Sequence, residues 1–108
     1  MVDLQWDRAF ALEQAADDEE VLAELLDLFH TSSASDLEKI NNAMDSNDPE
    51  ELMKAAHSMK GAAASLGVEA VRELAYEIET AGRDGNIEVG DTVAELEELL
   101  EIAVEEMK

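Results

Sequence analysis

Apolar side chains recur every three to four residues in each long segment of the chain, which is the spacing of one face of an α-helix. A short first helix is predicted over residues 6–16, and Trp6 and Phe10 are expected to pack it onto the rest of the protein. After a capping aspartate at position 17 or 18, a longer pattern follows, with apolar positions Val21, Leu22, Leu25, Leu28, Phe29, Leu37, Ile40 and Met44. A polar cluster over residues 31–35 interrupts this pattern, which leaves open whether residues 18–45 form one helix or two.

The next helix has the clearest boundaries. Asp48 is a suitable N-cap, Pro49 suits the first helical position, and a helix starting there is predicted to end at Leu66. Gly67 follows, and glycine readily adopts the left-handed conformation that closes a helix. Two more helices are predicted, one ending near Gly82 before a turn at residues 83–86 and one beginning near residues 91–92. Their apolar positions are Val71, Leu74, Ala75, Ile78, Val93, Leu96, Leu99, Leu100, Ala103 and Val104.

The composition agrees with this helical pattern. Ala, Glu and Leu dominate the 108 residues, there is one proline, and aromatic residues make up 4%, which is low for a β-sheet protein. A length of 108 residues is typical of one domain. The expected fold is therefore an all-α bundle.

The charge excludes several classes of function. Asp and Glu number 28 against 7 Lys and Arg, and the net charge of -21 argues against binding to nucleic acids or anionic membranes. The chain has no cysteine and two histidines, so neither a thiolate metal site nor a disulfide framework is expected. No segment has the pattern of a signal peptide or a membrane span, so a cytoplasmic location is expected.

Residues 52–68 break the acidic pattern, because these 17 residues contain no Asp or Glu. A helical wheel places five apolar residues of this segment on one stripe, which is the predicted core face: Leu52, Ala56, Met59, Ala63 and Leu66. His57 projects away from that stripe. The residues that share its side of the helix are Met53, Lys54, Lys60, Gly61 and Ala64.

The segment from Ala56 to Gly67, AHSMKGAAASLG, resembles the signature of histidine-containing phosphotransfer (HPt) domains of multistep two-component relays. The shared pattern is His-x-x-Lys-Gly, followed by Leu-Gly six residues after the lysine. The resemblance covers nearly the whole chain. It implies a single domain over residues 1–108, folded as an antiparallel four-helix bundle with one or more additional short N-terminal helices.

The resemblance also implies a role for each residue around the histidine. His57 would accept the phosphoryl group, Lys60 would lie beside its oxygens, and Gly61 would leave room for the partner. Glu79 would accept a hydrogen bond from Nδ1–H of His57, which leaves Nε2 as the nucleophile. Gly67 would end the helix and turn the chain. The sequence departs from the family at Ala62, where Ser or Thr is frequent.

The expected function is a phosphoryl carrier. His57 would receive the group from an aspartate of a receiver domain, in a response regulator or a hybrid sensor histidine kinase, and pass it to another receiver. No glycine-rich ATP-binding loop is present, so the protein is not expected to be an enzyme or to hold a cofactor of its own. Mg²⁺ is expected in the partner receiver, and the carrier is expected to be a monomer. The expected partner contacts are Met53, Lys54, Gly61 and Ala64.

Two alternatives remain open from the sequence. The first is a helical scaffold or adaptor that binds signalling partners without phosphotransfer. The second is a calcium loop, whose ligands would be Asp84, Asn86, Glu88 and Glu95, although Val89 stands where such a loop needs glycine. His30 has no basic neighbours, so it is expected to be a partly buried residue without a chemical role.

Overall fold

The structure is a computed structural model that describes residues 3–108. Within these residues every regular element is helical, apart from an isolated antiparallel bridge between Trp6 and Val68. None of the helices in this range is long and apolar enough to cross a membrane. The helices are α1 (Arg8–Gln14), α2 (Glu19–Asp45), α3 (Pro49–Leu66), α4 (Glu69–Arg83) and α5 (Gly90–Glu106).

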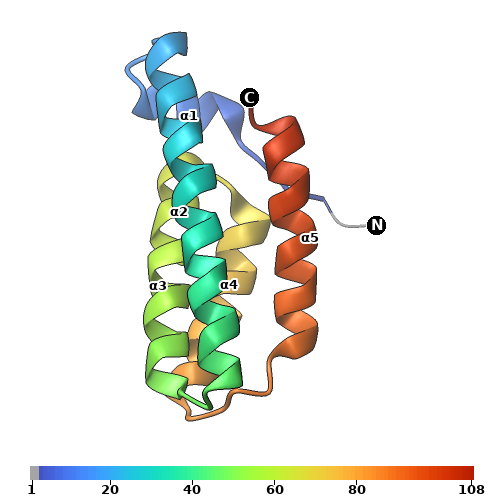
Figure 1. Cartoon of the computed structure of the whole chain (residues 1–108). Coiled ribbons are helices and arrows are strands. Elements are labelled where there is room, and N and C mark those ends of the chain that lie inside the picture. Colours follow the sequence, from blue (N-terminus) through green and yellow to red (C-terminus); the bar gives the residue numbers. More distant parts are fainter. Residues whose placement is uncertain (1–2) are drawn as a thin grey trace.

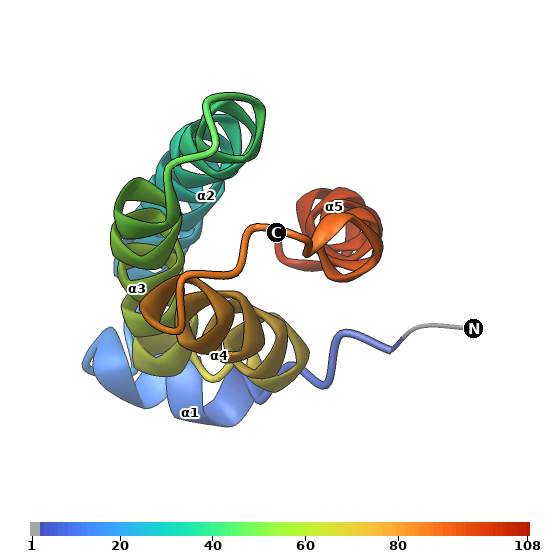
Figure 2. The same cartoon turned by 90° about the horizontal axis from the view of Figure 1, so that it is seen from below.

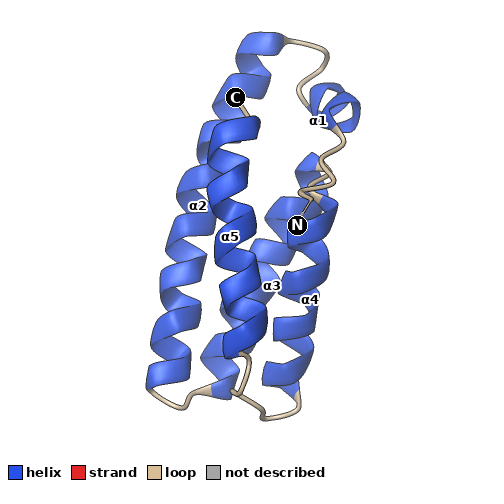
Figure 3. Cartoon of the chain, turned by 90° about the vertical axis from the view of Figure 1, so that its right-hand side faces the viewer, coloured by secondary structure: helices blue, strands red, loops and turns tan. Residues whose placement is uncertain are grey.

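The four long helices, α2 to α5, form the antiparallel bundle, and α1 lies across one end of it (Figure 1). Seen along the bundle, α3 and α4 lie side by side, and α2 and α5 flank them (Figure 2). Tight connections join α2 to α3 and α4 to α5 at the same end, whereas the turn between α3 and α4 lies at the other (Figure 3). The predicted all-α bundle with a short N-terminal helix is confirmed.

Residues 19–45 form one continuous helix, which settles the question that the pattern left open. Asp18 caps it by accepting hydrogen bonds from the backbone N–H groups of Glu20 and Val21. The serines in the middle do not break the helix. Ser32 donates its hydroxyl to the carbonyl of Phe29 within the same helix, and Ser33 is buried in the bundle.

The prediction for the buried face of α2 was partly wrong. Leu28 and Val21 belong to the predicted apolar face of α2, but Leu28 is 65% exposed and Val21 is also exposed. On α5, the predicted apolar position Val104 is exposed as well. Leu26, which the pattern left out, is buried instead. The neighbouring apolar residues 25, 26, 28 and 29 allow more than one rotation of the helix, and only packing against the other helices selects one of them.

The first helix is shorter than predicted, since it covers Arg8–Gln14 rather than residues 6–16. Trp6 precedes it and donates its indole N–H to the carbonyl of Leu66, at 3.1 Å. Backbone bonds run from Asp7 N–H to the Gly67 carbonyl and from Glu69 N–H to the Gln5 carbonyl. These bonds hold the N-terminal segment against the turn between α3 and α4, so the packing role predicted for Trp6 is confirmed.

Helix α3 has the predicted boundaries. The Asp48 side chain caps it by accepting from Glu51 N–H, Pro49 is its first residue, and Gly67 ends it with φ +73°. The last helix begins at Gly90, one residue before the predicted start. All five residues of the predicted core stripe of α3 are buried: Leu52, Ala56, Met59, Ala63 and Leu66.

Gly82 allows α3 and α4 to approach each other closely. A Cβ atom at this position would lie 2.8 Å from both Met53 N and Pro49 O, which are backbone atoms of α3. We expect Gly82→Ala to lower the free energy of unfolding by about 1–3 kcal/mol, because the helices must separate to admit the methyl group. Urea denaturation followed by circular dichroism measures this difference.

The matched control for Gly82→Ala is Gly61→Ala, in another helix interior. No atom lies within 4 Å of a Cβ at Gly61, so this substitution should stabilise the protein by up to about 1 kcal/mol through helix propensity. Equal stability of the Gly82→Ala variant and the unaltered protein would contradict the close approach.

Candidate functional site

His57 stands on the outer face of α3, with its side chain 68% exposed. Its Nδ1 lies 2.9 Å from Oε2 of Glu79, a residue of the neighbouring helix α4. A carboxylate can only accept a hydrogen bond, so this contact places the imidazole proton on Nδ1. Nε2 then carries the lone pair, and it has no hydrogen-bond partner among residues 3–108.

The Glu79 carboxylate is the buried centre of this site, with its side chain 3% exposed. Its Oε1 lies 2.7 Å from Nζ of Lys60, and its Oε2 lies 3.0 Å from Nη2 of Arg83. Burial by itself would raise the pKa of Glu79, but the contacts with Lys60 and His57 outweigh it and hold that pKa below its usual value. Glu79 is therefore ionised at neutral pH.

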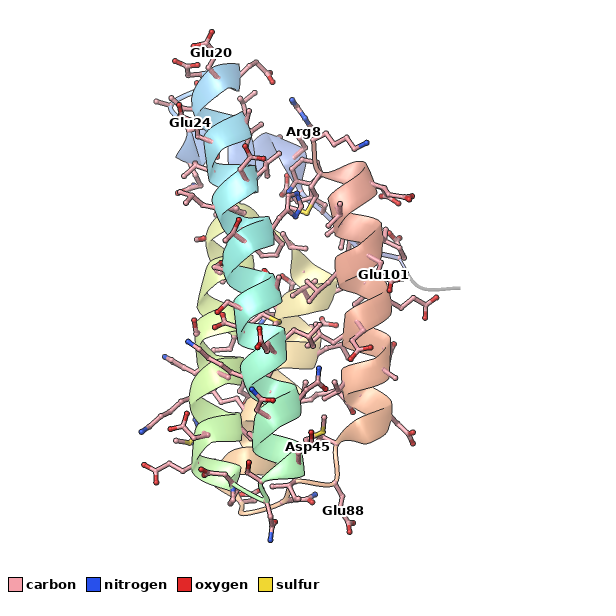
Figure 4. The ribbon with its side chains drawn as sticks, in the orientation of Figure 1. Arg8, Glu20, Glu24, Asp45, Glu88 and Glu101 are labelled. Carbon is pink, nitrogen blue, oxygen red and sulfur yellow. The ribbon has the colours of Figure 1, made fainter. Side chains whose placement is uncertain are left out.

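Lys60, Arg83 and the Glu79 carboxylate together leave a net charge of +1 beside the imidazole. The ammonium group of Lys60 also lies 5.4 Å from the centre of the Tyr76 ring, so α4 holds this side chain from two directions. Acidic side chains such as Glu20, Glu24 and Glu101 project from other parts of the protein (Figure 4). The site is therefore a small positive region on a strongly negative protein.

A pocket of about 400 Å³ opens beside the imidazole between α3 and α4. Its lining residues are Met53, Lys54, His57, Glu79 and Arg83. Lys54 also pairs with Glu50 and Glu51 on its own helix, at 3.4 and 3.9 Å. The charge of Lys54 is therefore partly neutralised by these two glutamates, although residues 52–68 themselves contain no Asp or Glu.

Arg83 was not among the predicted site residues, because the sequence predicts a turn over residues 83–86. The structure extends α4 to Arg83, which places the guanidinium one helical turn after Glu79. A spacing of four residues between an acidic and a basic side chain was the signal that could have found it.

Asp36 was also absent from the predicted site residues. It is buried, and it accepts a hydrogen bond of 2.9 Å from Ser58, which ties α2 to α3 next to His57.

After His57 along α3, the exposed positions 61 and 64 carry small uncharged residues. Gly61 and Ala64 are exposed there, and the position of a Cβ at Gly61 has no atom within 4 Å. Between α3 and α2 this surface continues into a shallow groove, which includes the exposed Leu28 and the small residues Ala62 and Ser65. Small and apolar side chains beside the imidazole leave room for the surface of another protein.

The remaining candidates lie elsewhere. His30 is partly buried in the middle of α2, and its Nε2 lies 2.9 Å from the carbonyl oxygen of Met107. Gly67 serves as the cap between α3 and α4 and does not touch the imidazole site. In the part of the chain that the structure describes, no three His, Asp or Glu side chains are grouped to hold a metal ion, and this includes Asp84, Glu88 and Glu95 of the calcium alternative.

Comparisons with known proteins point in one direction. Residues 24–108 match the sequence family described as the Hpt domain. A similar solved structure is histidine-containing phosphotransfer protein B from Pseudomonas aeruginosa, with a TM-score of 0.85 and 22% identity, covering 94% of this chain and 90% of that one. Another is the HPT domain of a hybrid histidine kinase from Shewanella, with a TM-score of 0.77 and 28% identity, covering 94% and 89%. No curated protein matches significantly.

Proposed function

The chain belongs to the Hpt domain family of phosphoryl carriers, and from that premise we propose that it carries a phosphoryl group on His57 between receiver domains of a phosphorelay. The observation that supports this proposal most strongly is the pairing of His57 with Glu79. A buried carboxylate that holds Nδ1–H leaves Nε2 exposed with a free lone pair, which is what a nucleophilic histidine requires.

The transfer step needs no metal ion bound by this chain. The Nε2 lone pair attacks the phosphorus of an aspartyl phosphate in the receiver, so that a P–N bond forms while the P–O bond breaks. The receiver aspartate leaves as a carboxylate, and the imidazole keeps its Nδ1 proton. Glu79 balances the positive charge that develops on the ring, and Mg²⁺ held by the receiver would supply most of the stabilisation of the phosphoryl oxygens. Reversal of the step passes the group to a second receiver.

The proposed partners are receiver domains of response regulators and of hybrid sensor histidine kinases. Such a receiver would meet Met53 and Lys54 on one side of His57, and Gly61 and Ala64 on the other. The groove between α3 and α2 supports the contact on the Gly61 and Ala64 side, because its lining has no charged residue and a docked protein there buries apolar area without desolvating ionic groups.

The direct test uses the unaltered protein and purified receiver domains from the same organism, radiolabelled on the aspartate, with Mg²⁺ present. We expect label to move to this chain and to be lost in acid but kept in base, as for a phosphohistidine. Stable binding of a receiver without any transfer of label would favour the scaffold alternative and contradict the proposal.

Lys60 is expected to affect transfer more than Lys54 does. The phosphoryl group adds about two negative charges, and a charge pair at about 4 Å is worth roughly 1 kcal/mol in water and more where a partner excludes solvent. We expect Lys60→Ala to slow transfer about tenfold in both directions and Lys60→Glu to slow it further. Lys54→Ala should have little effect, because Lys54 is exposed and pairs with Glu50 and Glu51. Rapid-quench measurement of label transfer gives these rates.

Salt provides the control for this prediction, since screening weakens interactions between exposed charges. The defect of Lys60→Glu should shrink as the ionic strength rises. Thermal unfolding of each variant is needed as well, because Lys60 also pairs with the buried Glu79. Normal transfer by a folded Lys60→Glu protein at low ionic strength would refute the electrostatic role.

A further inference from the structure

A second groove lies between α2 and α5, on a different pair of helices from the one that presents His57 and Glu79. In the view along the bundle, α5 stands apart from α2, whereas α3 and α4 lie against each other (Figure 2). The groove has a volume of about 240 Å³. Leu37, Leu100 and Val104 supply its apolar walls, Ser33 lies at its base, and Glu97 and Glu101 supply its acidic side chains.

The dimensions of this groove suit side chains of a helix. Its lining extends from His30 to Leu37 on α2 and from Glu97 to Val104 on α5, which is two helical turns, or about 10 Å, on each. The volume is below the roughly 300–1,000 Å³ of pockets for small organic ligands. A partner helix, in contrast, inserts a few side chains spaced three, four and seven residues apart into a groove of this kind.

A side-chain contact marks each of the two ends of the groove. At one end, His30 Nε2 lies 2.9 Å from the carbonyl oxygen of Met107. At the other end, Asn41 donates its amide N–H to Oε1 of Glu97, at 3.4 Å. The helices are therefore tied together above and below the opening, so the groove is part of the folded bundle.

Within the described residues, two side chains of the groove lack the contacts that their chemistry favours: a buried hydroxyl has no hydrogen-bond partner, and a large apolar side chain is exposed. The Ser33 hydroxyl is buried, at 2% exposed, and has no hydrogen-bond partner among residues 3–108. Buried polar groups in proteins nearly always have a partner. Val104, on the opposite wall, is a large apolar side chain that is 55% exposed. An occupant that covered Val104 and offered a donor or acceptor to Ser33 would satisfy both.

Charge decides what kind of occupant fits. The groove lining contains Glu97 and Glu101 but no lysine or arginine, in contrast to the His57 site with Lys54 and Arg83. A second copy of this chain would bring another net charge of -21 against these carboxylates. A basic partner avoids that repulsion and gains complementary ion pairs at the rim.

We propose that the groove between α2 and α5 binds a basic amphipathic helix of a partner protein. Its apolar side chains enter between Leu37, Leu100 and Val104, and its lysines or arginines pair with Glu97 and Glu101. This groove shares no lining residue with the pocket beside His57. The proposal does not depend on phosphotransfer.

The test uses the full chain and a model helix of about four turns, with leucines on one face and lysines on the other. Heteronuclear NMR should show the largest shifts at Ser33, Leu37, Leu100 and Val104, and none at His57. A peptide of the same charge with serine in place of leucine should bind much more weakly. Shifts centred on any other surface would overturn the proposal.

Matched variants separate this site from general attraction to an acidic protein. The double variant Glu97→Gln, Glu101→Gln should weaken binding about fivefold, as expected for the loss of two exposed ion pairs. The control, Glu95→Gln with Glu98→Gln, removes the same charge from α5 outside the groove and should change the affinity little. Equal losses in both double variants would overturn the proposal.

The apolar contribution has its own control pair. Val104→Ser should weaken peptide binding several-fold, whereas Leu28→Ser, at an exposed leucine outside this groove, should not. Both side chains are largely exposed, so neither variant should unfold the protein. Sedimentation equilibrium of the chain alone addresses the other occupant, and dimers that Val104→Ser abolishes would show that a second copy fills the groove instead.

Discussion

Replacement of His57 by glutamine is expected to abolish transfer of label from a phosphorylated receiver, whereas His30→Gln should leave transfer unchanged. Glutamine can still donate a hydrogen bond to Glu79, but its amide nitrogen has no lone pair available for attack on phosphorus. His30 lies partly buried against the carbonyl oxygen of Met107, away from the Lys60 and Arg83 charges. Acid-labile label on each variant, measured after gel separation, gives the result directly.

Folding provides the control for the His57 variant. The imidazole is mostly exposed, so its replacement should change the free energy of unfolding by no more than about 0.5 kcal/mol. The helical circular dichroism of His57→Gln should therefore match that of the unaltered protein. Undiminished label on a folded His57→Gln protein would disprove the assignment of the acceptor.

Gly61→Gln should slow transfer about 100-fold, because a side chain one turn from His57 would hold the receiver away from Nε2, and displacements of about 1 Å cost rates of this order. The space at Gly61 is open in the isolated protein, so the obstruction would be felt only in the complex. Single-turnover transfer at saturating receiver measures the effect on the step itself.

The same substitution should make the protein more stable. Glycine in a helix interior costs up to about 1 kcal/mol relative to better helix formers, and nothing within 4 Å opposes a Cβ here. A rise in stability together with a loss of transfer separates obstruction of the partner from damage to the fold. Gly61→Ala, with a much smaller side chain, should transfer at an intermediate rate. A fully active Gly61→Gln protein would show that no partner surface approaches this position.

The site combines exposure of the reacting atom with burial of the group that orients it. Glu79 is buried and ionised, so it fixes the imidazole through Nδ1, while Nε2 on the other side of the ring remains exposed. Lys60 and Arg83 form ion pairs with that carboxylate and offset its charge, since a buried charge without partners would be costly. In the proposed transfer step, the same two cations would attract the phosphoryl group. Structure and proposed chemistry therefore depend on one cluster of four side chains.

The sequence alone determined the features that depend on local interactions. The N-cap at Asp48, the proline after it and the glycine at position 67 act within one turn of the backbone, so the bounds of α3 could be predicted. The stripe of apolar residues placed His57 outside the core for the same reason, because the angle between residues of one helix is fixed. The motif around His57 also identified the family.

Only the tertiary structure decided features that involve two helices. Leu26 rather than Leu28 is buried because packing selects the rotation of α2, which its own apolar pattern left ambiguous. The pairing of Lys60 with Glu79 joins residues of α3 and α4, whose side chains meet only when these two helices pack together. Periodicity within a helix fixes which residues share a face, but the position of one face against another depends on the packing of the whole bundle.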